Sequence, residues 1–124
     1  MQPCETPLPF DARDAANLDS LKRALETIAR QVEGVDLETF LSDLHVADAV
    51  ALQLMVVGER ANKLSSEFRS NFPDVEWPKI ISLRNLIAHE YDRVDKARIW
   101  DIATEFAPAL HDALPEPPPP EAFD

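Results

Sequence analysis

The amino-acid sequence predicts an all-α protein, an antiparallel bundle of four main helices plus one short helix. Its 124 residues suit a single domain with one hydrophobic core. Glycine occurs only twice, which argues against a sheet with many tight turns. Apolar residues recur at helical spacing in successive segments joined by short connections. We therefore expect a helical domain over residues 14–114, with a flexible proline-rich leader (1–13) and a proline-rich acidic tail (115–124).

The first predicted helix covers residues 14–33. Its apolar residues step by three and four positions and form one stripe: Leu18, Leu21, Leu25, Ile28 and Val32. Gly34 follows directly, and glycine suits the left-handed conformation that often ends a helix.

A short helix and the longest helix follow. Asp36 is the expected N-cap of the short helix, whose apolar residues are Leu37, Phe40, Leu41 and Leu44. The long helix, residues 46–69, carries a stripe made of Val50, Leu54, Val57, Ala61, Leu64 and Phe68. A second apolar line (Leu52, Met55 and Val56) predicts that neighbours cover this helix on two sides, as in the central helix of a bundle.

Gly58 and Glu59 lie in the middle of the long helix. Glycine destabilises a helix interior by about 1 kcal/mol relative to alanine, so Gly58 predicts the close approach of another helix. Glu59 has two readings that the sequence leaves open. It is either a partner of Arg84 or a solvated residue beside Arg60 and Lys63.

The next helix is predicted over residues 78–90. A break at residues 71–74 precedes it, and Pro78 stands in its first turn, where the missing N–H does no harm. The expected buried stripe is Ile80, Leu83, Ile87 and Tyr91.

The last predicted helix begins after Asp95, its expected N-cap, and ends at Leu114. Its stripe is Ile99, Ile102, Phe106, Ala109 or Leu110, and Ala113. Pro108 predicts a kink. Residues 115–120 are expected to be an extended, solvated polyproline-like segment.

Composition limits the function classes. The formal charge of −11 argues against a generally basic nucleic-acid coat but not against a local basic site. Cys4, the only cysteine, excludes a disulfide within the chain. Neither a signal peptide nor a run of about 18 apolar residues is present, so we expect a cytoplasmic protein without membrane contact. The three histidines lie in separate segments, and we expect no metal site and no cofactor.

Residues 82–91 concentrate the reactive side chains. Arginine binds phosphate, histidine transfers protons near neutral pH, and a tyrosine hydroxyl can be modified. Asn85 and His89 are one helical turn apart and share a face, whereas Arg84 lies on a face about 100° away. Arg84 and His89 would act together through the reach of arginine, a loosened helix end, or a second copy of the helix across a dimer axis.

Basic residues are also concentrated here. Between Lys79 and Arg98, five basic residues stand against three acidic ones, a net charge of +2 that leaves −13 for the rest of the chain. A positive edge of this kind attracts a phosphate or an RNA strand. The alternative, which charge alone favours, is that these cations balance their neighbours and the helix C-terminus.

The segment Arg84-Asn85-Leu86-Ile87-Ala88-His89-Glu90-Tyr91 resembles the Arg-x4-His-x-Tyr motif of HEPN domains, specifically the HepT-like toxins of bacterial two-gene systems. Three further segments are similar to the same family: Val56-Val57-Gly58-Glu59-Arg60-Ala61 on the long helix, the break and re-entry at residues 72–83, and residues 91–100. The resemblance covers about residues 18–114 and leaves out both proline-rich ends.

The resemblance implies a homodimer whose motif helices face each other, and metal-independent endoribonuclease activity. His89 would be the proton-transfer group and Arg84 would hold the scissile phosphate. A base removes the proton of a ribose 2′-OH, whose oxygen attacks the adjacent phosphate, giving a 2′,3′-cyclic phosphate and a 5′-OH. Asn85, by its spacing from His89, would orient the imidazole or the RNA, and Glu59 is a supporting candidate.

Tyr91 matches the family tyrosine to which a partner nucleotidyltransferase antitoxin transfers AMP. The resemblance therefore implies a type VII toxin–antitoxin system in which the added bulk and charge block the cleft. Two other readings stay open. The chain is otherwise a non-catalytic helical subunit that binds a nucleotide or the nucleotidyltransferase, or a structural bundle in which His89 and Tyr91 only complete the helix end and the core.

Overall fold

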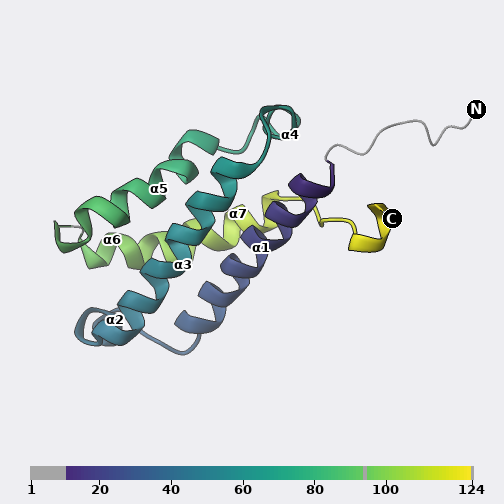
Figure 1. The fold of residues 1–124 in the computed structure, drawn as a ribbon. Helices are drawn as coiled ribbons and strands as arrows, with labels where there is room; N and C mark the ends of the chain where they lie inside the picture. Colours follow the sequence, from purple (N-terminus) through teal and green to yellow (C-terminus); the bar gives the residue numbers. More distant parts are fainter. Residues whose placement is uncertain (1–10, 94, 124) are drawn as a thin grey trace, which may run out of the picture.

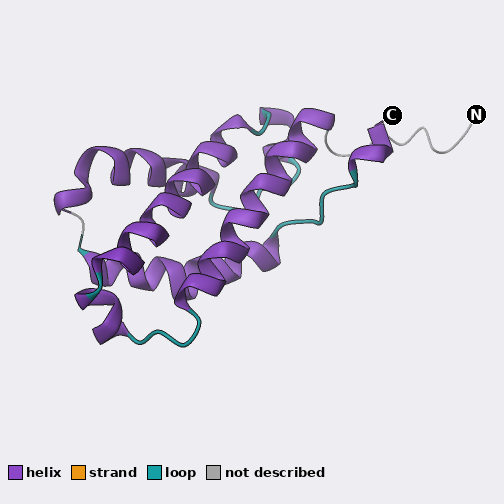
Figure 2. Ribbon diagram, turned by 60° about the horizontal axis from the view of Figure 1, so that its bottom comes forward, coloured by secondary structure: helices purple, strands orange, loops and turns teal. Residues whose placement is uncertain are grey.

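The computed structural model describes residues 11–123 apart from Val94, and for Glu90, Tyr91 and Pro120 it describes the backbone alone. The described part is built of helices and connecting loops, without a strand (Figure 2). Cys4 and most of the predicted leader lie outside the described residues. None of the described helices has the length and apolar composition that crossing a lipid bilayer requires.

Four long helical segments form an antiparallel bundle, which confirms the predicted all-α class (Figure 1). The elements in chain order are α1 (Ala12–Val32), α2 (Leu37–Ser42), α3 (Leu44–Lys63), α4 (Ser66–Ser70), α5 (Trp77–Glu90), η2 (Tyr91–Arg93), α6 (Lys96–Asp101), η3 (Ile102–Phe106), α7 (Ala107–Ala113) and η4 (Pro120–Phe123). The fourth long segment is the continuous run α6–η3–α7. The short helix α2 stands where the sequence predicted it, whereas a second short helix, α4, stands where the end of the long helix was predicted.

Helix α3 is the centre of the bundle and packs against both α1 and α5 (Figure 1). Its predicted stripe is buried: Val50, Leu54, Val57, Ala61, Leu64 and Phe68 are each at most 2% exposed. The second apolar line is only partly covered, because Met55 and Val56 pack on the core while Leu52 is 58% exposed.

The predicted continuation of this helix to Arg69 was wrong, since α3 ends at Lys63. Leu64 adopts an extended backbone, and Ser65 then caps α4 by accepting a hydrogen bond from the Phe68 N–H at 3.0 Å. Asp14 of α1 fixes this corner, since its carboxylate accepts from the Ser65 backbone N–H at 2.8 Å and from the Ser65 hydroxyl at 2.6 Å. A side-chain cap from another helix therefore ends α3, and such a contact is not visible in local periodicity.

The turns on either side of α2 follow the sequence prediction. Gly34 has a φ of 73°, the left-handed conformation expected of it. Asp36 caps α2 by accepting from the Thr39 N–H at 2.8 Å, and this hydrogen bond lowers the pKa of its carboxyl. Only Phe40 of the expected α2 stripe is buried, whereas Leu37, Leu41 and Leu44 are exposed.

The fourth helical segment, α6–η3–α7, is continuous, but its backbone hydrogen-bond pattern changes partway along it. Residues Ile102–Phe106 form a π-helical turn directly before α7, which carries Pro108 in its first turn. Proline lacks an N–H and crowds the preceding turn, which explains a local change of pitch at this point. Ile99, Ala103, Ala107, Leu110 and Leu114 are buried, and the predicted stripe residues Ile102 and Phe106 pack against this core while partly buried. Only the expected place of Ala113 in the stripe was wrong, because Ala113 is exposed.

Residues 115–119 of the tail form neither helix nor strand, and the Glu116 side chain is 85% exposed, but the start of the tail is bound to α1 rather than free. Lys22, only 4% exposed, donates to the carbonyl oxygens of Leu114 and Pro115 at 3.5 and 3.3 Å and forms an ion pair with Glu116 at 2.8 Å. Farther along, Phe123 packs against the core. The buried Lys22 on α1 therefore holds the first residues of the tail against the bundle.

Candidate functional site

Helix α5 carries the predicted site and lies unusually close to α3. A β-carbon at Gly58 would stand 2.8 Å from the backbone nitrogen of Arg84 and 3.1 Å from the carbonyl oxygen of Ile80. Only glycine permits this approach without a shift of one helix, which confirms the prediction made for Gly58. The position of Arg84 is thus set by backbone contact with α3.

Glu59, the next residue on α3, is a partner of Arg84. Its Oε1 lies 3.3 Å from Arg84 Nε, and its Oε2 lies 3.9 Å from Lys63 Nζ. Of the two readings left open by the sequence, the structure supports the partnership with Arg84, and Glu59 also lies near Lys63. The Arg84 and Glu59 side chains are 51% and 41% exposed, so solvent screens this ion pair. Its main effect is to orient the Arg84 guanidinium rather than to stabilise the fold.

A hollow of about 830 Å³ opens at the C-terminal end of α5. Asn85 and His89 line it from α5, as their shared helix face predicts, and Asp92 and Arg93 from η2 and Arg98 from α6 complete its polar rim. Its size falls within the range of about 300–1,000 Å³ typical of small-molecule sites. The remaining lining residues are Ser82, Leu86 and Ala88.

Arg84 does not line this hollow. Its guanidinium extends toward Glu59 and also donates to the Asn85 side-chain oxygen at 3.2 Å. Asn85 thus links Arg84 to the face that carries His89 within the described part of one chain. The helical prediction that Arg84 and His89 lie on different faces agrees with this arrangement.

Two cations of the hollow were not among the predicted site residues. Arg93 and Arg98 are both exposed. They line the hollow together with His89, and Asp92 is the one carboxylate among the lining residues. Both arginines belong to the positive edge predicted from the sequence, but the sequence gives no reason to place either of them beside the motif residues. The bend through η2 brings them there, and it follows α5 immediately.

The remaining predicted features are less fully described. The side chain of Tyr91 lies outside the described residues, although its chain neighbours Asp92 and Arg93 line the hollow. Among the described residues, no group of three or more His, Cys, Asp or Glu side chains is placed to hold a metal ion.

An antiparallel helical bundle that carries the Arg84–Asn85 pair and His89 on one helix, α5, agrees with the HEPN-like architecture expected from the sequence. The comparisons with known proteins make this assignment specific. Residues 21–116 match the family model described as "Ribonuclease HepT-like". The chain belongs to the HepT-like family of HEPN ribonucleases.

Three relatives illustrate this membership. A candidate RNase of Methanocaldococcus jannaschii is 30% identical over 76 residues, which are 61% of this chain and 70% of that protein. A candidate RNase of Caldanaerobacter subterraneus subsp. tengcongensis is 28% identical over 112 residues, 90% of this chain and 94% of the relative. A Thermococcus cleftensis protein named "Probable ribonuclease HepT" is 27% identical over 93 residues, 75% and 84% of the two chains. No solved structure matches this chain significantly.

Proposed function

We propose that this chain is a metal-independent endoribonuclease that cleaves RNA at the hollow around His89. The observation that carries the proposal is the gathering of His89, Asn85 and two exposed arginines at one open site of an otherwise acidic chain. The relatives named as ribonucleases support the same reaction class.

In the proposed reaction the nucleophile belongs to the RNA. His89 takes the proton of a ribose 2′-OH, and the 2′ oxygen forms a bond to the adjacent phosphorus. The bond from phosphorus to the 5′ oxygen breaks, and that oxygen takes up a proton from solvent water and leaves as a 5′-OH, while the proton held by His89 returns to the solvent. The products are one RNA with a 2′,3′-cyclic phosphate and one with a 5′-OH, so no covalent enzyme intermediate is needed.

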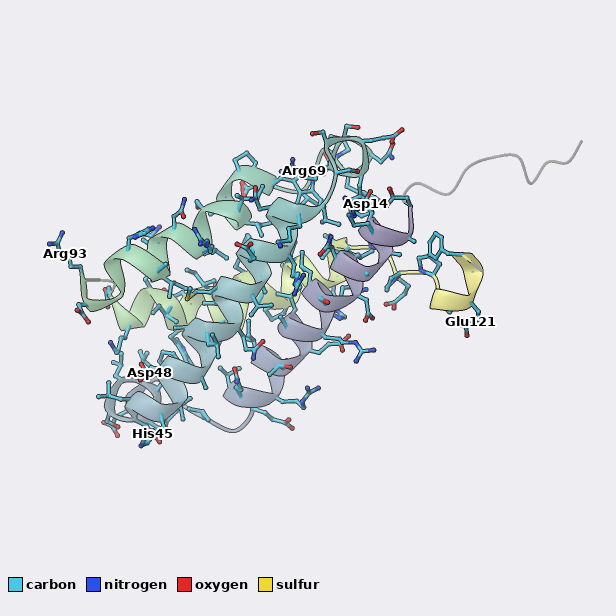
Figure 3. All side chains as sticks on the ribbon, in the orientation of Figure 1. Asp14, His45, Asp48, Arg69, Arg93 and Glu121 are labelled. Atoms are coloured by element: carbon cyan, nitrogen blue, oxygen red, sulfur yellow. The ribbon has the colours of Figure 1, made fainter. Side chains whose placement is uncertain are left out.

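The test is cleavage of a labelled single-stranded RNA in the presence of EDTA, with analysis of the product ends. His89→Ala should reduce the rate by about 100-fold or more, because general acid–base catalysis typically contributes about 10²–10⁴. His45→Ala is the matched control, since His45 is an exposed histidine on another helix (Figure 3). A wild-type rate in His89→Ala, or products with 3′-OH and 5′-phosphate ends, would refute the mechanism.

Arg84 has the proposed role of holding the scissile phosphate and stabilising the charge that gathers on it. Because Arg84 does not line the hollow of its own chain, we assign this role to a homodimer in which the motif helices of two copies face each other. Glu59 would orient the guanidinium from α3. Mixing inactive Arg84→Ala and inactive His89→Ala proteins should then restore part of the activity, whereas no recovery in a mixture that exchanges subunits contradicts a shared site.

Regulation is proposed to act at Tyr91, by AMP transfer from a nucleotidyltransferase antitoxin of a type VII toxin–antitoxin system. AMP attached there would place bulk and negative charge beside the residues Asp92 and Arg93 that line the hollow. Incubation with the cognate nucleotidyltransferase and ATP should add the mass of one or more AMP groups and abolish cleavage. An unchanged mass, or an equal increase in Tyr91→Phe, would contradict this assignment.

A further inference from the structure

Arg98 differs from five other cations of this chain in having no carboxylate partner among the described residues. Lys22, Arg23, Lys63, Lys79 and Arg84 each form an ion pair with a carboxylate. Within the part of the chain that the structure describes, the guanidinium groups of Arg93 and Arg98 form neither an ion pair nor a hydrogen bond. The guanidinium groups of Arg13 and Arg69 also lack a partner among the described residues, but Arg93 and Arg98 are set apart because they line the same hollow. Two unpaired guanidinium groups that line one hollow can bind an anion from outside the chain.

The backbone around Arg98 is held firmly. Asp95 caps α6 by accepting from the Ala97 N–H at 3.0 Å, and the Arg98 N–H donates to the Asp95 carbonyl at 2.9 Å. The next residue, Ile99, is only 1% exposed and anchors α6 in the core. Trp100 follows and packs on Phe40 with ring centroids 5.1 Å apart. Arg98 therefore lines the hollow from the fixed first turn of α6, whereas Asn85 and His89 line it from α5.

We propose that Arg98, together with Arg93, binds the RNA phosphates next to the one that is cleaved. The proposal rests on the proposed ribonuclease function and extends it to residues outside the Arg-x4-His-x-Tyr motif. Arginine suits this role because its planar guanidinium donates two parallel hydrogen bonds to one phosphate. The ligand is the backbone of single-stranded RNA, and Arg98 acts by binding it rather than by taking part in bond breaking.

Binding and cleavage can be measured separately, which keeps the two proposals distinct. A fluorescent RNA with 2′-O-methyl groups lacks the nucleophile and stays intact, so its affinity can be followed by anisotropy over a range of salt concentrations. We compare Arg98→Gln and Arg93→Gln with Arg13→Gln, an equal charge change at an exposed position on α1. Arg98→Lys keeps the charge and loses the planar fork.

Removal of one phosphate contact should make the plot of log affinity against log salt shallower by about 0.7. We expect Arg98→Gln to show this change and a several-fold weaker affinity at low salt, Arg98→Lys to retain the slope, and Arg13→Gln to match the wild type. With cleavable RNA, Arg98→Gln should raise KM several-fold and leave kcat at saturating RNA nearly unchanged.

An Arg98→Gln protein with the same affinity and slope as Arg13→Gln overturns the inference, and so does a wild-type protein that fails to bind the methylated RNA. Binding that depends on Arg98 without any cleavage of unmodified RNA would sustain the phosphate site and refute the ribonuclease mechanism.

Discussion

Asp14 and Arg93 lie at opposite ends of the bundle, and their surroundings differ in burial and in pairing (Figure 3). Around Asp14, the polar side chains of Asn17, Arg60 and Ser65 join α1 to the end of α3; we call these four residues the α1 network. Asp14 is 4% and Asn17 is 7% exposed. Around Arg93, the polar side chains of the hollow are exposed, and both arginines are free of partners among the described residues.

Polar and charged side chains therefore have different roles in the two regions. Buried polar groups such as Asp14 stabilise the fold only because each is hydrogen-bonded, and the loss of a partner leaves a desolvated group behind. Exposed, unpaired groups contribute little to folding and keep their hydrogen-bonding capacity for a ligand. We therefore expect substitutions in the α1 network to lower stability and substitutions in the hollow to lower RNA binding or cleavage.

The largest expected loss of stability is that of Asp14→Ala. It removes the acceptor for both the backbone N–H and the hydroxyl of Ser65, so we expect unfolding to become easier by roughly 2–3 kcal/mol. Chemical denaturation measures this difference. Asp19→Ala is the control, because the Asp19–Arg23 pair is largely exposed and should be worth less than about 1 kcal/mol. Equal losses of unfolding free energy in Asp14→Ala and Asp19→Ala would contradict the larger stabilising role that we assign to the α1 network.

Gly58→Ala should connect the two regions, because Gly58 lies where α3 touches α5. The new β-carbon would clash with the Arg84 backbone, and overpacking of this kind costs about 1–3 kcal/mol, of which the better helix propensity of alanine recovers up to about 1 kcal/mol. We expect a net destabilisation of about 1–2 kcal/mol together with slower RNA cleavage, since α5 must shift. Asn62→Ala, at an exposed position of the same helix, should change neither, and a neutral Gly58→Ala would contradict the close approach.

The smallest expected effect concerns Glu116 and pH. The hydrogen bond and the positive charge of Lys22 lower the pKa of Glu116 from its ordinary value of 4.5. A lowered pKa in the folded state means that the ion pair stabilises the protein above about pH 4.5 and that this contribution is lost as the pH falls through the folded-state pKa.

Melting temperatures of the wild type and Glu116→Gln, measured from pH 7 down to pH 3, test this sign. The wild type should melt slightly higher at neutral pH, and the difference should shrink in acid. A difference that grows as the pH falls would contradict the assigned direction.

The sequence predicted the helical class, the central position of α3 and the close contact at Gly58, because these depend on periodicity and on one residue that lacks a side chain. It also placed Asn85 and His89 on one face, since that follows from helix geometry alone. It missed the break after Lys63, where Ser65 donates hydrogen bonds to the carboxylate of Asp14 on α1, a helix far away in the sequence. It missed the docked start of the tail for the same reason, because Lys22 and Glu116 meet only in the folded chain.

For Arg93 and Arg98 of the site, too, the decisive arrangement forms only in the folded chain. Sequence reasoning found an excess of positive charge between residues 79 and 98 but could not say which cations would be neutralised by a neighbour. Arg84 belongs to the motif, yet its own chain pairs it with Glu59. Arg93 and Arg98, outside the motif, line the same hollow as His89 and have no side-chain partner among the described residues. Pairing is a property of the folded chain, and it decides which charges are available to a ligand.

The central claim is that the hollow around His89 acts on RNA while the α1 network maintains the fold. Measuring RNA cleavage and the free energy of unfolding side by side for His89→Ala and Asp14→Ala tests it most directly. We predict that His89→Ala loses cleavage by about 100-fold or more with an unfolding free energy within about 0.5 kcal/mol of the wild type. Asp14→Ala should lose stability and, well below its melting temperature, retain most of its cleavage rate. A His89→Ala protein that cleaves at the wild-type rate, or that is destabilised as much as Asp14→Ala, would contradict the account.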